Sequence, residues 1–327
     1  MTESIENLAK IDVTPKALVI ENEGLKKAVW VLSDIDGTVN DEGEIESERI
    51  YTIEPAKEAF RELEQRGISV GLITARSFAE AEEYQTKLLI SGNIVCEDGA
   101  VIVLPKSAST RNMSELIKFG KIETHEGRVV LLPKGDLEKS PITTEDIKNL
   151  IEEVELSTKT RIISSCTSAP DELRVAAKHA TLEAAKLSQD RLASAYAVNL
   201  TEEQRELAKD LSDSKGIRTF TNPVDKITMF FPKGVNKGHA VDILLEITPL
   251  LYPSLNVEGT FLIAIGNNNN DSPFLKKADI AVVVRKKNGD LAILPENIPQ
   301  GTIIPNAPFS HGVKEAVSQI LEALKPN

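Results

Sequence analysis

The sequence predicts an α/β fold with a mostly parallel central sheet, into which a second, α+β unit is inserted. Three observations lead to this prediction. Short apolar runs alternate with amphipathic helical segments in both the first and the last part of the chain. The links between them are short, which favours parallel strands joined by right-handed crossovers. Between residues 105 and 221 this pattern gives way to a mixture of short strands and helices, which indicates an insertion.

Composition and charge limit the class of protein. The chain has 327 residues, enough for two hydrophobic cores, and a formal net charge of −12. An acidic surface argues against nucleic acid or an anionic membrane as the main partner, but it allows a small phosphorylated metabolite. Neither of the two cysteines has metal-ligand spacing, the acidic N-terminus does not resemble a secretory signal, and no apolar run reaches the length of a membrane span. We therefore expect a reduced, cytoplasmic protein.

The first part of the chain is expected to alternate between strands and helices. Each boundary follows from apolar periodicity and from the positions of Pro and Gly. The expected elements, in order, are a strand at 28–32, a helix from Pro55 to Gly67, a strand at 68–73, a helix from Ser77 to about residue 89, a strand at 94–96 and a hairpin-like return at 101–104.

The insertion and the closing part of the chain are predicted in the same way. The insertion should hold a strand at 128–132 and a helix that begins with the capping-box pattern Thr201-Glu202-Glu203-Gln204 and ends at Gly216. The core pattern then resumes with a strand at 226–231, a helix after Lys237, strands at 261–265 and 280–284, and a final helix at 313–324. The predicted division is an N-terminal extension at 1–24, a core formed by 25–104 and 222–327, and an inserted unit at 105–221.

The strand at 28–32 leads directly into the stretch Ser33-Asp34-Ile35-Asp36-Gly37. Residues two apart on an extended chain point to the same side, so the two carboxylates repel one another unless a cation or a shared proton offsets them. Gly37 allows an immediate sharp turn. Such a pair suits a Mg²⁺ site beside an aspartate nucleophile, because Mg²⁺ prefers a few hard oxygen ligands completed by water and substrate phosphate. A plain surface turn is the alternative for this segment alone.

Three further strand ends carry polar groups. The strand at 68–73 ends in Thr74-Ala75-Arg76, where a hydroxyl and a guanidinium beside a helix N-terminus make a sensible anion site. Lys237 stands where a turn enters a helix, and the strand at 261–265 is followed by Gly266-Asn267-Asn268-Asn269-Asn270-Asp271. Taken singly, these features can also be interpreted as a helix cap, a surface lysine and a polar loop.

Together, the four strand ends resemble the four motifs of the haloacid dehalogenase superfamily of aspartate-nucleophile phosphatases, spread over residues 29–284. The large insertion between the second and third motifs resembles members with a C2-type cap. Glu97-Asp98-Gly99-Ala100 and Pro232-Lys233-Gly234-Val235-Asn236-Lys237-Gly238 resemble the IIB (Cof-like) subgroup, and the tail from Gly301 to Val317 is similar to mannosyl-3-phosphoglycerate phosphatases. The resemblance implies a Rossmann-like core with a C2-type cap.

The resemblance also implies a role for each motif residue. Asp34 would attack phosphorus and become an aspartyl phosphate, while Asp36 would protonate the leaving oxygen and then activate the hydrolytic water. Lys237 would stabilise the transferring phosphoryl group. The substrate phosphate would be bound by Thr74, Ala75, Lys237 and Asn270, the Mg²⁺ ion by Asp34, Asp36, Asn267 and Asp271, and acids or substrate would be oriented by Arg76.

The fourth motif departs from the pattern of the subgroup, Gly-Asp-x-x-Asn-Asp. Asn267 stands where that pattern has its first Asp. An amide oxygen can ligate Mg²⁺, but it brings no charge. We therefore expect weaker metal binding, or a larger share of the metal for Asp271.

The leading hypothesis is a Mg²⁺-dependent phosphomonoester hydrolase, monomeric or homodimeric, that acts through an aspartyl phosphate. Its expected substrate is a small phosphorylated sugar, polyol or sugar acid, with a compound like mannosyl-3-phosphoglycerate as one candidate, since a cap encloses small molecules and excludes water. Two alternatives stay open. One is a phosphomutase, which would return the phosphoryl group to a sugar. The other is a catalytically weak protein that binds a phosphorylated metabolite, which Asn267 would explain.

Overall fold

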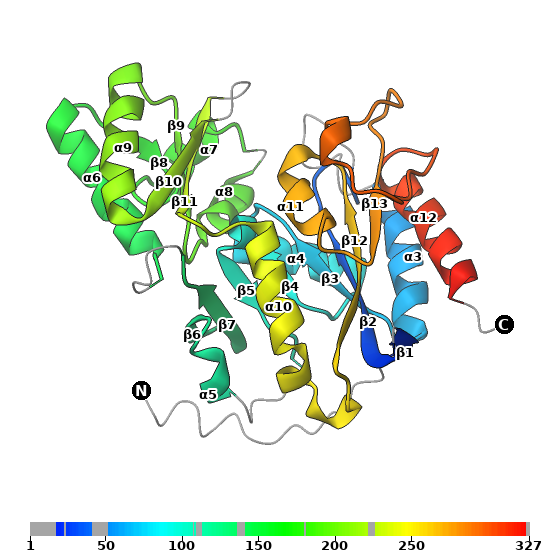
Figure 1. The fold of residues 1–327 in the computed structure, drawn as a ribbon. Helices are drawn as coiled ribbons and strands as arrows, with labels where there is room; N and C mark the ends of the chain where they lie inside the picture. The colour runs from blue at the N-terminus through cyan, green and yellow to red at the C-terminus, as the bar shows by residue number, and fades with distance from the viewer. Residues whose placement is uncertain are drawn as a thin grey trace.

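A computed structural model describes residues 18–22, 24–40, 52–106, 108, 113–135, 141–179, 181–221 and 226–324. Two sheets organise these residues, a large one in the core and a small one in a second unit that stands beside it (Figure 1). The predicted α/β fold with a mostly parallel sheet is confirmed. The predicted extension at 1–24 lies mostly outside the described residues, apart from its last part.

The large sheet has nine strands in the order β13-β12-β2-β3-β4-β5-β7-β6, with β1 paired to β2. The five strands from β13 to β4 are parallel to one another, and the pairs beyond β4 are antiparallel. The strands are β1 (Val19–Asn22), β2 (Leu25–Ser33), β3 (Ser69–Ile73), β4 (Ile94–Cys96), β5 (Val101–Val103), β6 (Gly120–His125), β7 (Arg128–Pro133), β12 (Gly259–Gly266) and β13 (Ile280–Val283).

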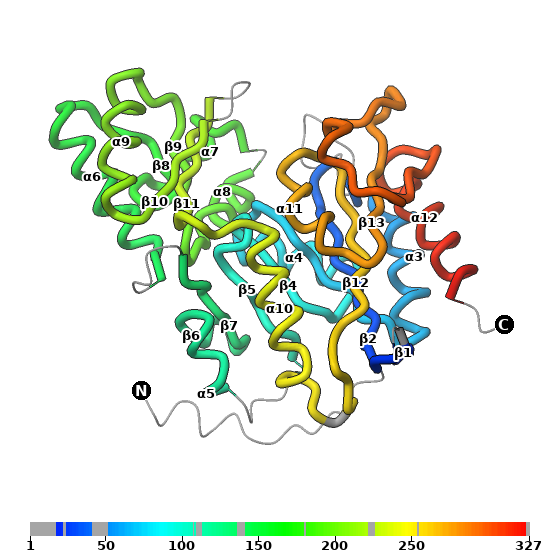
Figure 2. Tube along the Cα trace, in the orientation of Figure 1, coloured from blue at the N-terminus to red at the C-terminus, as the bar shows by residue number. Residues whose placement is uncertain are grey.

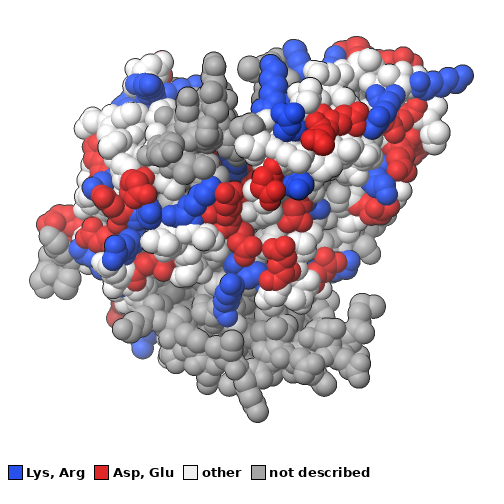
Figure 3. Space-filling view, turned by 180° about the vertical axis from the view of Figure 1, so that it is seen from behind, with Lys and Arg blue, Asp and Glu red and all other residues white. Residues whose placement is uncertain are grey.

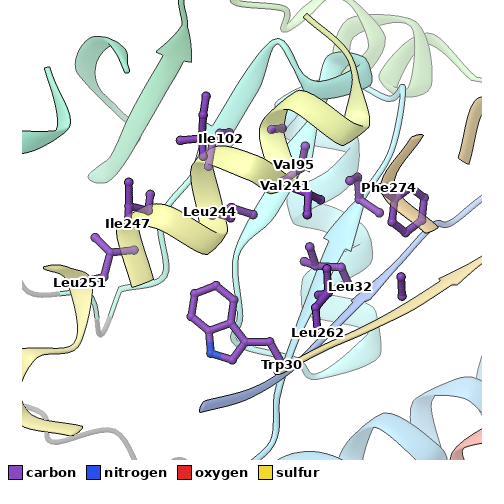
Figure 4. Packing of buried hydrophobic residues seen from close by; sticks show 14 of the residues in the cluster. Trp30, Leu32, Val95, Ile102, Val241, Leu244, Ile247, Leu251, Leu262 and Phe274 are labelled. Carbon is purple, nitrogen blue, oxygen red and sulfur yellow. The ribbon is translucent and has the colours of Figure 1, made fainter. Parts of the chain in front are cut away.

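Helices cover both faces of this sheet, because its parallel strands are apolar on both sides. In β2, Val29 and Val31 face one layer of helices. Trp30 and Leu32 face the other layer, on the side of α10 (Figure 4). The first layer consists of α3 (Glu54–Gln65), α4 (Phe78–Leu88) and α12 (Phe309–Ala323), and the second of α5 (Met113–Leu116), α10 (Lys237–Leu251) and α11 (Ser272–Leu275). Short 3₁₀ turns lie at η2 (Glu97–Gly99), η3 (Pro253–Leu255), η4 (Asn269–Asp271) and η5 (Pro295–Asn297).

The second unit has a four-stranded antiparallel sheet in the order β10-β11-β9-β8. One face packs on α6 and α9, and the other on α7. As predicted, Thr201 caps α9 and Gly216, with φ +75°, ends it. The elements are α6 (Thr144–Thr158), β8 (Ile163–Ser164), α7 (Pro170–Ala176), α8 (Leu182–Gln189), β9 (Ala195–Val198), α9 (Glu202–Lys215), β10 (Ile217–Thr221) and β11 (Ile227–Pro232).

Strand pairing differs from the predicted division in three places. β1, which lies in the predicted extension at 1–24, pairs with β2 and so belongs to the large sheet of the core. β6 and β7, which we expected in the insertion, extend the large sheet through β5. β11, which we expected in the core, pairs with β9 and β10 in the small sheet, so that prediction was wrong. β11 follows β10 closely in the sequence, which favours antiparallel pairing of the two strands, because parallel strands need a long crossover.

The described surface mixes charges of both signs. Figure 3 shows one face, on which acidic and basic side chains lie interspersed. Many of them form exposed pairs, such as Lys314 with Glu58 at 2.6 Å, which contribute little to stability. Within the described ranges, no helix has both the length and the hydropathy needed to cross a bilayer.

Phe60 on α3 provides a test of the core. Its side chain is fully buried against the large sheet. We expect Phe60→Ala to lower the free energy of unfolding by about 3–5 kcal/mol, through lost burial and the cavity it leaves. Urea denaturation measures the change. Leu156→Ala, at a position that is 80% exposed, is the control and should cost less than about 0.5 kcal/mol. Similar losses for both variants would contradict the assigned core.

Candidate active site

The centre of the site is the carboxyl edge of the parallel strands. Asp34 follows the last residue of β2, and β2 lies between β12 and β3. Ser33 is in register with Ile265 on one side and with Leu72 on the other. The N–H of Asp34 donates to the carbonyl of Ile265 at 2.9 Å, which extends the ladder by one residue. The segments that follow all three strands therefore meet around Asp34.

A tight turn follows this strand and fixes the first carboxylate. Gly37 has φ +73°, a conformation that suits glycine, and its N–H donates to Asn40 Oδ1 at 3.0 Å. Thr38 Oγ1 donates to Asp34 Oδ2 at 3.3 Å. Asp34 itself is only 6% exposed. The segment is thus a turn, as the simpler interpretation holds, but one that presents a buried carboxylate.

The two carboxylates of the first motif have different environments. Asp34 is buried, whereas the side chain of Asp36 is 46% exposed. Arg76 holds Asp36 with a two-pronged contact, Nε to Oδ2 and Nη2 to Oδ1, both at 2.9 Å. Arg76 Nη1 also donates to Glu80 at 3.2 Å. Burial alone would lower the pKa of Arg76, but Asp36 and Glu80 outweigh it and raise that pKa well above its ordinary value.

Lys237 joins two segments of the site. Its side chain is 1% exposed, and its Nζ donates to Asp34 Oδ1 and to Asp271 Oδ1, each at 2.7 Å. Burial would lower the pKa of Lys237, but Asp271 and Asp34 together raise it. Burial and the nearby Asp271 raise the pKa of Asp34 from 3.8 to about 7, although Lys237 opposes them. The predicted convergence of Lys237 with the first carboxylate is therefore observed.

Asp271 closes the loop after β12. Its Oδ2 accepts the N–H groups of Asn267 at 2.9 Å and Asn268 at 3.0 Å, while its Oδ1 accepts from Lys237. A side chain on Gly266 would collide with this carboxylate, since a Cβ there would lie 2.8 Å from Asp271 Oδ2. Both oxygens of Asp271 thus accept hydrogen bonds within the protein. The sequence suggested Asp271 as a metal ligand that compensates for Asn267, and these contacts argue against that role.

The side chain of Asn267, in contrast to that of Asp271, is buried without hydrogen bonds to any residue that the structure describes. Its residue is 2% exposed, yet neither polar atom of its side chain has a hydrogen-bond partner among the described residues. A buried amide without a partner is costly, so this position is suited to a group that binds there. With Asp34 it offers hard oxygen donors of the kind Mg²⁺ prefers. The described residues contain no group of three or more His, Cys, Asp or Glu side chains that could hold a metal by themselves.

The second motif lies at the end of β3. Thr74 is 1% exposed, and its Oγ1 accepts the N–H of Arg76 at 3.2 Å. It does not cap α4, because Ser77 does so through a capping box. Ala75 is partly exposed, and its carbonyl accepts from Arg191 of the second unit at 3.3 Å. Asn270 is exposed on the loop after β12 and lies outside the buried cluster.

Sequence reasoning missed several residues that reach this edge. No contact was predicted for Glu97, Asp98 or Arg191, although Glu97 and Asp98 belong to the stretch that resembles the IIB subgroup. In the structure, Glu97 accepts from the backbone of the second unit at 2.7 Å and 3.0 Å, and Asp98 pairs with Arg218 at 2.6 Å. One signal was available, because these two acids follow β4 at the same sheet edge as the other motifs.

Comparisons with known proteins agree with this geometry. A family model described as haloacid dehalogenase-like hydrolase matches residues 31–293. A glucosyl-3-phosphoglycerate/mannosyl-3-phosphoglycerate phosphatase from Persephonella marina is 21% identical over 302 residues, which cover 90% of this chain and 98% of that protein. A phosphatase with the same name from Methanococcoides burtonii is 25% identical over 270 residues, covering 79% of this chain and 85% of that protein.

Solved structures show the same fold. A haloacid dehalogenase-like hydrolase from Bacteroides thetaiotaomicron superposes with a TM-score of 0.56 at 15% identity, covering 89% of this chain and 98% of that chain. A HAD subclass IIB sugar phosphatase superposes with a TM-score of 0.53 at 14% identity, with the same coverage. At such identities the likeness concerns the fold alone.

The raised pKa of Asp34 predicts how stability depends on pH. The folded protein holds this proton more tightly than the unfolded chain, so the stability that the group contributes is present below pH 4 and is lost as the pH rises to about 7. Asp34→Asn cannot ionise. We expect it to raise the free energy of unfolding of the metal-free protein by about 1–4 kcal/mol at pH 8 and to change it little at pH 4. Thermal unfolding at both pH values measures the difference, and an equal change at both would contradict the assignment.

Proposed function

Because the chain belongs to the haloacid dehalogenase-like hydrolase family, we propose that it is a phosphatase that acts on a small phosphorylated sugar, polyol or sugar acid. One observation carries the proposal: a buried cluster in which Lys237 Nζ lies 2.7 Å from both Asp34 and Asp271. Asp271 holds the ammonium group of Lys237 in place beside Asp34. From there the lysine can neutralise charge on a transferring phosphoryl group while the carboxylate of Asp34 attacks phosphorus. Both curated relatives carry phosphatase names, which agrees with the predicted enzyme class.

In the proposed reaction, an oxygen of Asp34 forms a bond to phosphorus as the bond between phosphorus and the leaving oxygen breaks. The leaving oxygen takes its proton from Asp36. In the second step Asp36 removes a proton from water, the water oxygen attacks phosphorus, and the bond to Asp34 breaks to release inorganic phosphate. The half-exposed position of Asp36 supports this role, because a group that exchanges protons with the leaving group and with water must reach both. Both of its oxygens accept from Arg76, so in this role one of them would exchange that contact for the leaving group or the water.

The residues around Asp34 fit a Mg²⁺ ion. Asp34 would hold it together with the amide of Asn267, which has no hydrogen-bond partner in the part of the chain that the structure describes. When bound, Mg²⁺ neutralises charge on the phosphoryl oxygens. Asp271 would act indirectly, since its oxygens hold Lys237 and the loop that carries Asn267. Thr74 and Ala75, at the end of β3, would bind the phosphate oxygens through hydroxyl and backbone N–H groups.

The substrate class rests on the second unit and on the relatives. Arg191 of that unit donates to the carbonyl of Ala75 at 3.3 Å. Its positive charge therefore lies beside residues 74–76, which we call the phosphate loop, where it would attract a negatively charged leaving group. The two curated relatives are named for phosphoglycerates that carry a sugar, and such compounds have a carboxylate. We therefore place a phosphorylated sugar acid first among the candidate substrates, with the second unit as its cap.

The activity itself is the first test. We expect purified protein to release inorganic phosphate from p-nitrophenyl phosphate and from at least one sugar phosphate in the presence of Mg²⁺, and to lose that activity when Mg²⁺ is chelated. Asp34→Asn should fall below about a thousandth of the wild-type rate, because the nucleophile is gone. Equal rates for the variant and the wild type would reject the proposal. Transfer of phosphate within the sugar, with no release, would indicate a phosphomutase instead.

The neutral amide of Asn267 is expected to weaken metal binding, and a substitution at this position tests that. We expect Asn267→Asp to bind Mg²⁺ tighter by about tenfold or more, since it adds a charge among buried hard donors. Isothermal titration calorimetry measures this without any turnover. Asn270→Asp, which adds the same charge at an exposed position of the same loop, is the matched control. Equal gains for both variants would mean that the effect is a general one of charge, and that Asn267 does not face the metal.

A further inference from the structure

The turn after β4 has an unusual backbone conformation, and none of its residues has a role in the proposed reaction. Glu97, Asp98 and Gly99 have φ values of +52°, +57° and +97°. Two consecutive non-glycine residues in the left-handed region are rare, and such strain persists only where the surroundings impose it. The contacts of this turn, on both of its sides, supply that constraint.

On its core side, the turn is bound to two parts of the catalytic edge. The N–H of Glu97 donates to the carbonyl of Arg76 at 2.8 Å, and the N–H of Asp98 donates to the carbonyl of Thr74 at 3.0 Å. Gly99 lies so close to α10 that a Cβ on it would be 2.9 Å from the backbone nitrogen of Lys237. A displacement of this turn would therefore shift both the phosphate loop and the start of the helix that carries the lysine.

On its other side, the turn contacts the second unit through both of its carboxylates. Glu97 is fully buried and accepts the N–H groups of Leu192 at 2.7 Å and Ala193 at 3.0 Å. Asp98 Oδ2 accepts from Arg218 Nη2 at 2.6 Å. Leu192 and Ala193 lie between α8 and β9, whereas Arg218 belongs to β10. The two acids therefore hold separate elements of that unit, whose course Figure 2 traces.

These contacts resist separation of the two units. A buried carboxylate that loses both of its N–H donors is left without compensation, which is costly in a dry environment. A carboxylate paired with arginine loses a charge-assisted bond when the units move apart. Ser77 adds a third contact, because its Oγ donates to the carbonyl of Leu187 at 2.7 Å.

We propose that Glu97 and Asp98 are positioning residues that lock the second unit, the cap, onto the catalytic edge and set the phosphate loop at the same time. Neither needs to touch the substrate. Their effect on turnover rests on the proposed function, whereas the lock itself is a property of the structure and can be tested without turnover.

Hydrogen exchange tests the lock directly. We expect Glu97→Gln and Asp98→Asn, which keep shape but weaken the contacts, to speed amide exchange at residues 187–194 by about tenfold or more while exchange in β2 and α3 stays unchanged. Glu172→Gln is the matched control, because it removes a 2.6 Å ion pair with Arg161 that lies wholly within the second unit. It should leave residues 187–194 unchanged. Unchanged protection in both test variants, or faster exchange throughout the core, would overturn the proposal.

Kinetics test the consequence. With the sugar phosphate that is turned over fastest, we expect both variants to lower kcat by about tenfold with a smaller change in KM, because the cap no longer closes correctly. With p-nitrophenyl phosphate, whose leaving group needs less enclosure and less protonation, the loss should be smaller. Equal losses on both substrates would overturn the positioning role. If the wild type hydrolyses neither substrate, the proposed function fails, and the exchange measurement still decides the lock.

Discussion

The ammonium group of Lys237 lies between two buried carboxylates, and the rest of the site depends on that contact. Asp34 follows β2, Asp271 follows β12, and Lys237 begins α10. Each charge would be costly to bury alone, but together they compensate one another. The two contacts of Lys237, each 2.7 Å long, therefore hold together three segments that are far apart in sequence. Removal of the lysine would leave two like charges facing each other in a dry site.

A second set of polar contacts begins at Asp36, two residues after Asp34, and extends outward to the second unit. Asp36 is held by Arg76, which also pairs with Glu80, and Glu80 completes the capping box of Ser77. The hydroxyl of Ser77 in turn donates to the carbonyl of Leu187 on α8. The candidate acid and the cap are thus connected through one continuous network. Such a connection provides a physical route by which closure of the cap could alter the position of the acid.

Much of this could be predicted from sequence, because strand ends are recognisable and parallel strands end at one edge. That rule brought together Asp34, Thr74 and Asp271, each of which follows a strand of the large sheet. It does not account for Lys237, because the strand before it, β11, belongs to the small sheet. The place of Lys237 was predicted from the resemblance to the motifs of the family. The rule could not assign β11 to its sheet, since pairing partners depend on tertiary contacts rather than on local pattern. Nor could it choose between Asn267 and Asp271 as the proposed metal ligand. That choice depends on the loop hydrogen bonds that engage both oxygens of Asp271.

The central claim is that Asp34, supported by Lys237, captures phosphorus. The most direct measurement is the mass of the peptide that contains residue 34 after rapid acid quenching of a reaction with a turned-over substrate. The account predicts a phosphorylated peptide in the wild type, none in Asp34→Asn, and a greatly reduced amount in Lys237→Met. Phosphorylation at another residue, or a phosphorylated peptide that is still found in Asp34→Asn, would contradict it.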